Sequence, residues 1–280
     1  MSNFKVHRET FPSIANLIST IDSRENCEIM SDEHQSQTKE GKSGGWYNTR
    51  SYQEACTFAK FGWPDVLGDL KKALRASIKS SAKYQVVQKT MPSSNIVGYV
   101  PHVPNALQNL PNSMINTERF PQKRKTLHVI YCNGGNCNEE PEFYLKAGTA
   151  MINALNIIER SGVQVKIDLC FKPSSSGNEC VCPTVTLKDY GQRFDLLKLC
   201  FPLANSSMQR RLGFKWLETC STIQNSSWAC GYGRTITDHA TCVEILGDDS
   251  TYVLSNFWIR SNNYDIEKIL NYLDFKINTK

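Results

Sequence analysis

At 280 residues the chain is long enough for one large domain, or for one domain with a substantial extension. Hydrophobic residues form 40% of it and aromatic residues 10%, which excludes a chain that is disordered along its whole length. The net charge of +5 permits contact with nucleic acid but does not require it.

The N-terminus and the apolar runs do not indicate export or membrane insertion. The first residues lack the apolar core of a secretory signal. No apolar run approaches the ~20 residues that a membrane-spanning helix needs. We therefore expect a soluble cytoplasmic protein without membrane contact. The eleven cysteines are expected to be mostly free thiols, since those in apolar runs, such as Cys170 and Cys200, behave as small buried hydrophobes.

Residues 1–90 are predicted to form an N-terminal helical extension. Apolar residues at helical spacing predict a short helix within residues 1–25. Residues 31–45, "SDEHQSQTKEGKSGG", are almost without apolar side chains and predict a flexible polar linker. A second helix is predicted to begin after Ser51, which is followed by Glu54 in the capping-box pattern.

Glycine and proline residues set the boundaries of the next segments. Gly62, Trp63 and Pro64 are predicted to form the corner of a helical hairpin, because glycine ends a helix and proline is favoured in a first turn. Trp63 is expected to plug this corner. Residues 91–125 contain five prolines, which few helices tolerate, so we predict an extended connector that wraps over a core.

From residue 126 the pattern becomes that of strand, helix and strand. Residues 127–131 form a short β-rich run, and residues 142–161 repeat apolar side chains on one face of a helix. Gly162 is placed to end this helix. The alternation of apolar and polar residues at 163–169 predicts a half-buried strand. A βαβ unit of this length implies that its two strands are parallel.

The C-terminal part is predicted to add further strands and two helices. Strands are predicted at "TVTLKD", "TCVEIL" and "TYVLSNFWI". Residues 193–219 are expected to be helical with a break near Pro202, and the segment that begins at Asp265 is expected to close the chain as a helix. The order of elements predicts an α/β fold.

The first strand of this region ends in the loop "CNGGNCN", at the edge of the sheet where many α/β proteins bind a ligand. The loop has no lysine, and neither the phosphate-binding motif nor the dinucleotide motif is present. Backbone N–H groups of residues 133–136 could still meet an anion at the helix N-terminus. However, Glu139, Glu140 and Glu142 would repel an anion, and they stabilise the helix themselves.

Two cysteine pairs are candidates for a structural zinc site. Cys132 and Cys137 are five positions apart, whereas Cys180 and Cys182 are separated by one residue. Tetrahedral zinc sites favour two pairs of matching spacing, whereas these two pairs differ in spacing and no histidine lies near either of them. We expect no metal and no cofactor, with Cys180 and Cys182 the better candidates if zinc is present.

Cys132 and Cys137 are also candidates for a nucleophile, because a helix N-terminus lowers the pKa of a nearby thiol. A catalytic thiol needs a base, and Asp238 with His239 lies in a late segment that could approach the strand ends. A cysteine-dependent enzyme is therefore one alternative, although the spacing does not require it.

Arg210 and Arg211, with Lys215, would form a basic stripe on a helix that also carries Phe214 and Trp216. Such a stripe could contact phosphates, which favours a nucleic-acid-associated protein as another alternative. Solvated charges on a helix surface are the ordinary explanation of the same pattern.

Residues 126–280 resemble a von Willebrand factor A-type domain, in the strand "LHVIYC", the helix "AGTAMINALNIIERSG" and the strand "VQVKIDLC". The resemblance implies an α/β sandwich with a mostly parallel central sheet. It also implies a cation-binding Asp-x-Ser-x-Ser loop, where this chain has Cys132 at the aspartate position and Gly134 and Asn136 at the serine positions. A thiol and a glycine cannot supply hard oxygen ligands to magnesium, so the usual metal site is expected to be lost.

The chain is also similar to an uncharacterised family of bacteriophage-encoded proteins. The similar segments are "SYQEACTFAKFGW", "VPHVPNALQNLPNSM" and "LANSSMQRRLGFKWLE", which cover residues 46–270 loosely. The resemblance implies a phage origin and the cytoplasm of an infected host cell, but no particular activity. With a phage origin, the nucleic-acid-associated alternative becomes a protein of phage replication.

Together these patterns predict a non-enzymatic protein-binding or scaffold protein, built on a degenerate A-type domain. Its strand-end face is expected to bind a protein partner, and nucleic acid remains a possible one. The predicted contact residues are Cys132, Asn133, Gly134, Gly135 and Asn136, with Arg210 and Arg211 as secondary candidates.

Overall fold

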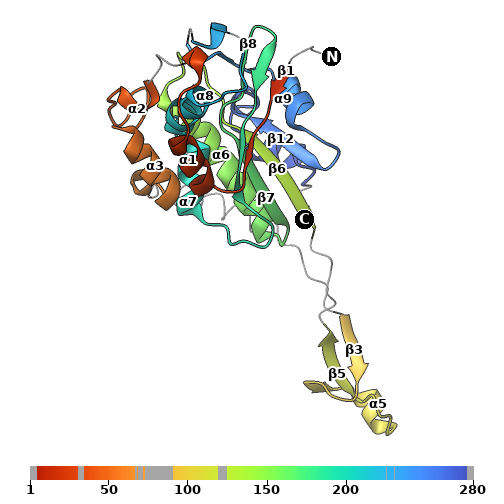
Figure 1. The fold of residues 1–280 in the computed structure, drawn as a ribbon. Helices are drawn as coiled ribbons and strands as arrows, with labels where there is room; N and C mark the ends of the chain where they lie inside the picture. Colours follow the sequence, from red (N-terminus) through yellow and green to blue (C-terminus); the bar gives the residue numbers. More distant parts are fainter. Residues whose placement is uncertain are drawn as a thin grey trace. The chain divides into compact units, whose positions relative to one another are not determined.

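The structure is a computed structural model that describes residues 5–30, 35–66, 68, 72, 91–118, 125–224, 226–229 and 231–275. The chain divides into two compact units, drawn as ribbons in Figure 1. Residues 1–84 and 126–280 form the larger unit, which we call the body. Residues 85–125 form the smaller unit, which we call the insert.

A five-stranded sheet in the order β12-β6-β7-β10-β2 lies at the centre of the body (Figure 1). Three of its four strand pairs are parallel, and β7 with β10 is antiparallel. The predicted α/β class with a mostly parallel central sheet is confirmed. The strands are β2 (Thr10–Phe11), β6 (Thr126–Cys132), β7 (Gln164–Cys170), β10 (Thr184–Lys188) and β12 (Thr251–Ser255).

The predicted βαβ unit is present as β6, α6 and β7, and its two strands pair in parallel. The helix α6 (Pro141–Arg160) begins with a proline in its first turn, where no backbone N–H is needed. It ends before Gly162, whose φ of +92° is a left-handed conformation that suits glycine. Its buried face includes Ala147, Met151 and Leu155.

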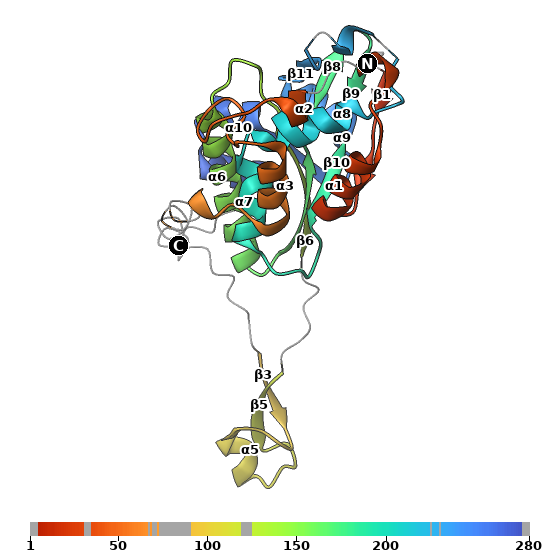
Figure 2. The same cartoon turned by 60° about the vertical axis from the view of Figure 1, so that its left-hand side comes forward.

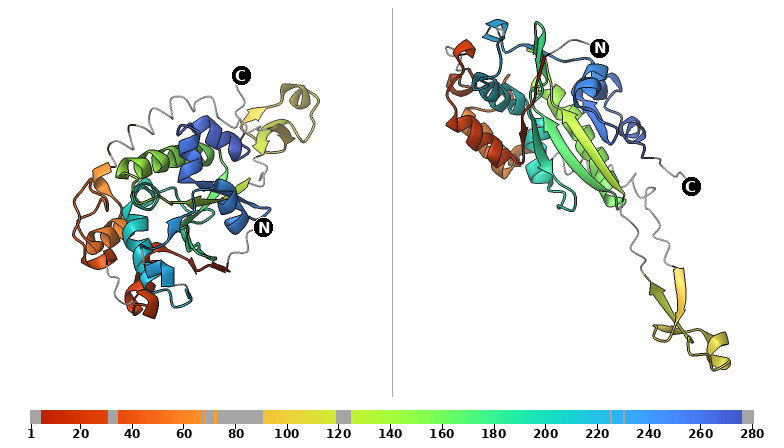
Figure 3. Two further views of the ribbon diagram at one scale, coloured as in Figure 1. Left: turned by 90° about the horizontal axis from the view of Figure 1, so that it is seen from above. Right: turned by 45° about the vertical axis from the view of Figure 1, so that its right-hand side comes forward.

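Side chains alternate along the strands and give the sheet two buried faces. Val129 faces the main core, to which α6 and α7 (Leu196–Ala204) also contribute. Cys132 faces the opposite side, in a smaller cluster with Cys242 of α9 (His239–Leu246). Figure 3 shows the blue α9 on one side of the strands and the red and orange N-terminal helices on the other.

The N-terminal segment contributes strands and helices to the body. β1 pairs with β9 in a second sheet of order β1-β9-β8-β11, and β2 forms an edge of the central sheet. The segment predicted as an N-terminal helical extension thus contains strands as well as helices, and its α3 lies beside α7 (Figure 2). The elements are β1 (Lys5–His7), α1 (Ile14–Ser23), η1 (Glu28–Met30), α2 (Gln35–Thr38), α3 (Tyr52–Phe61), β8 (Ser174–Ser176), β9 (Glu179–Val181) and β11 (Arg234–Thr235).

The predicted boundaries of α3 agree with the structure. The Oγ of Ser51 accepts a hydrogen bond from the N–H of Glu54 at 3.1 Å, so it caps the helix as expected. Gly62 follows the last residue of the helix with a φ of +101°. Residues 64–66, 68 and 72 are helical, as expected for the second arm of a hairpin, and the rest of that predicted helix lies outside the described residues.

The helical region predicted at residues 193–219 is divided into three helices. Pro202 lies inside α7, and the break falls at Asn205, close to the predicted position. A π-helix, η3 (Met208–Gly213), and α8 (Phe214–Glu218) follow. π-Helices are rare and frequently occur at functional sites.

The prediction of a strand at residues 241–246 is wrong, because these residues lie in α9. The Asp238 carboxylate caps this helix and accepts a hydrogen bond from the N–H of Thr241 at 2.9 Å. Cys242 and Ile245 are its buried residues, and their spacing of three fits one face of a helix.

The rest of the C-terminal region agrees in part with prediction. β12 covers the first residues of the strand predicted at 251–259, and α10 (Asn256–Ser261) covers the remainder. The predicted closing helix is present as α11 (Ile266–Tyr272), and a short η4 (Ser226–Ala229) precedes β11.

The insert contains short strands and a helix, whereas we expected an extended connector. Its sheet has the order β3-β5-β4. Pro104 lies in the first turn of its helix, where proline is tolerated, and Pro92 lies in the edge strand β3. The elements are β3 (Met91–Asn95), β4 (Val100–Pro101), α5 (Val103–Leu107) and β5 (Met114–Glu118).

Every helix in the described part of the chain falls short of the length and apolar character that a membrane crossing requires.

One face of the central sheet carries a polar network that joins four strands. Nε2 of His128 lies 2.7 Å from Oδ2 of Asp168, and Nδ1 lies 3.1 Å from Oγ1 of Thr251. The Thr186 hydroxyl donates to Asp168 at 2.7 Å. Burial raises the pKa of Asp168, but the hydrogen bonds from His128 and Thr186 and the charge of Lys166 outweigh it, so the pKa lies below its ordinary value.

Asp168→Asn is expected to destabilise the body by about 2 kcal/mol near neutral pH, because two charge-assisted hydrogen bonds are weakened. Since the pKa of Asp168 is depressed in the folded state, its stabilisation is present above the unfolded pKa of ~3.9 and is lost as pH falls through the folded pKa. The variant should therefore lose stability less steeply than the parent below about pH 5. Urea unfolding at a series of pH values measures this, with the exposed Asp249→Asn as control. Equal slopes for D168N and the parent would contradict the prediction.

Candidate functional site

The carboxyl ends of three parallel strands meet at one edge of the central sheet. Cys132 at the end of β6 lies between Cys170 of β7 and Ser255 of β12 in the strand register. The predicted ligand loop follows Cys132, so its position at the strand ends agrees with the sequence. The side chains that contact this loop determine whether a ligand can bind there.

Amide side chains close the start of the loop. Nδ2 of the buried Asn133 donates to the Pro202 carbonyl at 3.0 Å. Asn256, which follows β12, donates from Nδ2 to Oδ1 of Asn133 at 2.9 Å and to the Gly134 carbonyl at 3.3 Å. The hydroxyl of Tyr131 in turn donates to Oδ1 of Asn256. Hydrogen bonds within the protein therefore occupy the groups that a ligand would use.

The two glycines of the loop allow close packing of the backbone. A Cβ on Gly134 would lie 2.7 Å from Cγ2 of Thr235, and a Cβ on Gly135 would overlap the Tyr144 hydroxyl. The Gly135 carbonyl accepts hydrogen bonds from Oγ1 of Thr235 at 2.8 Å and from Nε2 of Gln209 at 3.2 Å. These contacts explain the glycine pair without a bound phosphate.

Arg210 in η3 binds the far side of the loop. Its guanidinium donates to the carbonyls of Asn136 at 3.0 Å, Glu139 at 2.6 Å and Trp46 at 2.5 Å. The same group stacks on the rings of Trp46 and Tyr144, at 4.2 Å and 5.1 Å from the ring centres. Burial lowers the pKa of Arg210 from its ordinary value. The side chain is buried and holds the loop against the N-terminal segment.

Arg211 binds the N-terminal segment with every donor that it has. Its Nε donates to Oγ1 of Thr49 at 2.9 Å, and its Nη atoms donate to the carbonyls of Ser36, Lys39, Thr49 and Arg50 at 3.0 to 3.2 Å. An arginine has five N–H groups, so the guanidinium is fully satisfied. Residues 36–50, most of which we expected to be a flexible linker, are held in place by this side chain.

Of the two predicted arginines, Arg210 contacts the loop after β6 and Arg211 contacts the N-terminal segment. One of the seven predicted contact residues is exposed. Asn136 is exposed, and the others are buried: Cys132, Asn133, Gly134, Gly135, Arg210 and Arg211. Lys215 is buried as well. The basic stripe that favoured nucleic-acid binding is therefore inside the body, and its charges do not face solvent.

Five cysteines form a buried thiol cluster that sequence spacing did not reveal. Cys132 makes thiol hydrogen bonds with Cys170 and Cys242, and Cys182 makes them with Cys170 and Cys180. Hydrogen bonds to the thiols of Cys170 and Cys242, together with burial, raise the pKa of Cys132 well above its ordinary value. A protonated, buried thiol is inert as a nucleophile.

His239 and Asp238, the residues of the alternative Cys–His–Asp arrangement, make their described hydrogen bonds to groups other than a thiol. Nε2 of His239 lies 3.1 Å from the Tyr272 hydroxyl, and Nδ1 lies 3.5 Å from Oγ of Ser255. Asp238 uses its carboxylate to cap α9 at Thr241. Burial lowers the pKa of His239, which disfavours its charged form.

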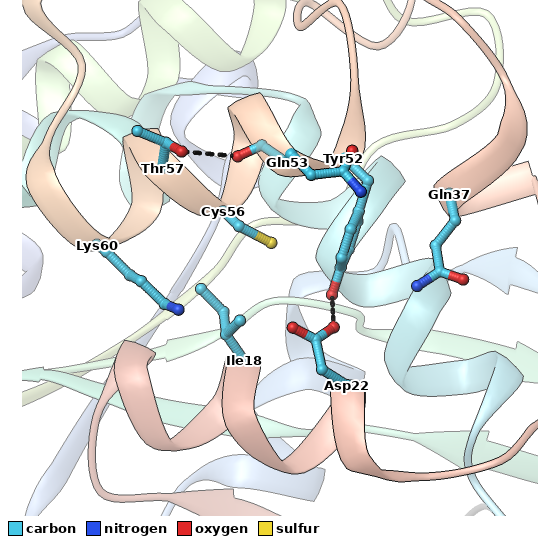
Figure 4. A pocket seen from close by; sticks show the side chains of 8 residues that line it. All are labelled: Ile18, Asp22, Gln37, Tyr52, Gln53, Cys56, Thr57 and Lys60. Carbon is cyan, nitrogen blue, oxygen red and sulfur yellow. Dashed lines mark hydrogen bonds between the residues drawn. The ribbon is translucent and has the colours of Figure 1, made fainter.

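The residues that the structure describes contain no group of three or more His, Cys, Asp or Glu side chains arranged to hold a metal ion. They do form a pocket of about 380 Å³ between α1, α2 and α3. Figure 4 shows Cys56 and Lys60 of α3 directed toward Ile18 and Asp22 of α1. The Tyr52 hydroxyl donates to Asp22 at 2.7 Å, and burial raises the pKa of the Cys56 thiol to about 11. The pocket therefore holds no activated thiol.

These features define an α/β protein whose strand-end loop is closed by its own side chains. A family model matches residues 2–276, and the chain belongs to this family, which is described as a domain of unknown function (DUF7192). Membership of an uncharacterised family, expected from the sequence, is confirmed. No curated protein and no solved structure matches the chain.

Arg211→Lys keeps the charge but has three donors in place of five. We expect a loss of about 3 kcal/mol of stability, because at least two buried carbonyls lose their partner. Amide hydrogen exchange should accelerate in residues 36–50 more than in α6. The exposed Arg193→Lys is the matched control, and equal exchange in R211K and the parent would refute the role of Arg211.

Cys137 is expected to react with iodoacetamide at least about a hundredfold faster than Cys132, because labelling a buried thiol first requires local opening. Cys137 is exposed, and Cys132 is buried. Mass spectrometry of single peptides measures both rates, with Cys230 replaced by serine because it lies outside the described residues. Fast labelling of Cys132 would instead support the cysteine-enzyme alternative.

Proposed function

We propose that this chain is a non-enzymatic protein-binding protein, whose contact surface is the exposed tip of the loop after β6. The observation that carries the proposal is the buried Arg210, which holds the carbonyls of Asn136 and Glu139 while the loop tip stays exposed. The tip consists of Asn136, Cys137 and Asn138. A loop that is already held in one conformation loses little entropy when a partner binds.

Trp46 extends this surface with an aromatic side chain. Trp46 is 36% exposed, and its ring lies on the guanidinium of Arg210 and donates from Nε1 to the Cys137 carbonyl at 2.6 Å. Tryptophan is enriched among the residues that dominate binding at protein interfaces. The amides of Asn136 and Asn138 can both donate and accept hydrogen bonds. The partner is therefore a folded protein with a pocket for an indole ring beside polar groups.

The environments of Cys132, His239 and Asp238 support binding in preference to catalysis. Cys132 is buried with a raised pKa, and His239 contacts Ser255 and Tyr272. Asp238 is engaged as a helix cap. A thiol enzyme would need its base and orienting carboxylate beside the sulfur.

We further propose that the body is a degenerate A-type domain of a phage-encoded protein, located in the cytoplasm of the host cell. The parallel β6–α6–β7 unit and the loop at the strand ends support this assignment. In this proposal, the amides of Asn133 and Asn256 take the space that a cation and its ligands occupy in a metal-binding A-type domain.

Cys137 allows the contact surface to be tested with a native side chain. A benzophenone maleimide attached to Cys137, in a Cys230→Ser background, should cross-link one discrete protein in extracts of the cells that make the chain. The captured protein is then purified, and its affinity is measured. Trp46→Ala should weaken binding at least tenfold, about 1.4 kcal/mol or more, because the exposed indole is lost.

A label at Tyr190→Cys in a Cys137→Ser background serves as the control, since Tyr190 is exposed elsewhere on the body. Equal capture from labels at Cys137 and at Tyr190→Cys, or an unchanged affinity of W46A for the partner, would contradict the proposed contact surface.

A further inference from the structure

The insert has a hydrogen-bonded backbone, but its residues 96–115 contribute no buried side chain. None of the described residues 96–115 is buried, and the core clusters of the described residues contain none of them. Eleven large apolar side chains are exposed in the described chain, and seven of them lie in the insert. These seven are Ile96, Val97, Tyr99, Val100, Val103, Leu107 and Leu110.

Hydrogen bonds hold the insert in a defined conformation, so the exposure does not come from a lack of structure. The N–H of Tyr99 donates to the Ile115 carbonyl at 3.1 Å, and that of His102 donates to Ser113 at 2.7 Å. β3 and β4 both pair with β5. A small sheet of this kind is marginally stable until its apolar face is covered.

The size of the insert limits how it can be stabilised. Folded units of about 40 residues usually need disulfides, a metal ion or association with another chain. Residues 85–125 contain no cysteine, and the described residues contain no group arranged to hold a metal ion. Of these three sources of stability, association with another chain is the one that remains for the insert.

The charge of the insert indicates what kind of surface it fits. From Met91 to Thr117 the sequence has no Asp, Glu, Lys or Arg. Burial of this segment therefore removes no charged side chain from water. A charged partner surface would lose its hydration without gaining a counter-charge. The matching surface is apolar and uncharged, and a second insert has this character.

The apolar area is also of the size that a dimer needs. A standard interface buries about 800 Å² on each partner. The seven side chains are 43% to 80% exposed. At roughly 100 Å² each they present an area of that order, whereas exposed patches on monomers are typically a few hundred Å².

We propose that the insert is a dimerisation element, through which two copies of this chain associate by the exposed apolar side chains of their inserts. The contact is isologous: the same patch on both copies meets across a two-fold axis. This inference goes beyond the proposed function, because it concerns a different unit and a different partner from the loop after β6.

Sedimentation of the full chain between about 1 and 100 µM tests the proposal, because self-association depends on concentration. The parent should sediment as a dimer at the upper end of this range. The double variant Val97→Asp, Leu107→Asp should raise the dissociation constant at least tenfold, because two carboxylates would be buried in an apolar contact. Phe61→Asp is the matched control, since Phe61 is 70% exposed in the body.

Hydrogen exchange on the parent gives a second readout that does not depend on whether the variant folds. Peptides within residues 96–110 should become protected as the concentration rises, while peptides of α6 should not change. A parent that stays monomeric throughout, or a double variant that dimerises as the parent does, would overturn the proposal. Concentration-independent exchange in 96–110 would overturn it too, as would a monomer whose insert binds vesicles of anionic and neutral phospholipid.

Discussion

Two adjacent arginines on the π-helix η3 hold together segments that are far apart in the sequence. Arg210 joins the loop after β6 to Trp46, and Arg211 binds the backbone from Ser36 to Arg50. A buried charge is costly unless its donors are satisfied, and both guanidinium groups are satisfied largely by backbone carbonyls. The rest of the body therefore requires the N-terminal segment, because without it the buried Arg211 would lose all five of its acceptors and Arg210 one of its three carbonyls.

This constraint explains why one part of the fold could be predicted and another could not. The βαβ unit, the Ser51 cap and the end of α6 at Gly162 follow from local patterns, and the structure contains all three. Residues 31–45 look like a linker because their side chains are polar. Residues 36–50 are bound to Arg211 mainly through their backbone carbonyls. The types of these residues do not indicate which carbonyls a distant arginine will contact.

The candidate site also has a part that could be predicted from the sequence and a part that could not. Its position at the strand ends could be predicted, because the loop follows a strand and precedes a helix. Its contents could not, since Asn256 comes from another strand end and Arg210 from a helix that looks solvated in sequence. The thiol cluster could not be predicted either, because its members come from distant parts of the sequence. The register of β6 and β7 and the packing of α9 bring Cys132, Cys170 and Cys242 together.

The two proposed surfaces have complementary physical properties. The loop tip is small, polar and held rigid, so it can contribute specificity but little buried area. The exposed side chains proposed as the contact of the insert are apolar and uncharged, so they contribute area and few directional contacts. Dimerisation through the insert would place two loop tips in one particle. Where a partner offers two copies of its own site, the second contact becomes intramolecular and overall binding strengthens without any new interaction at the loop.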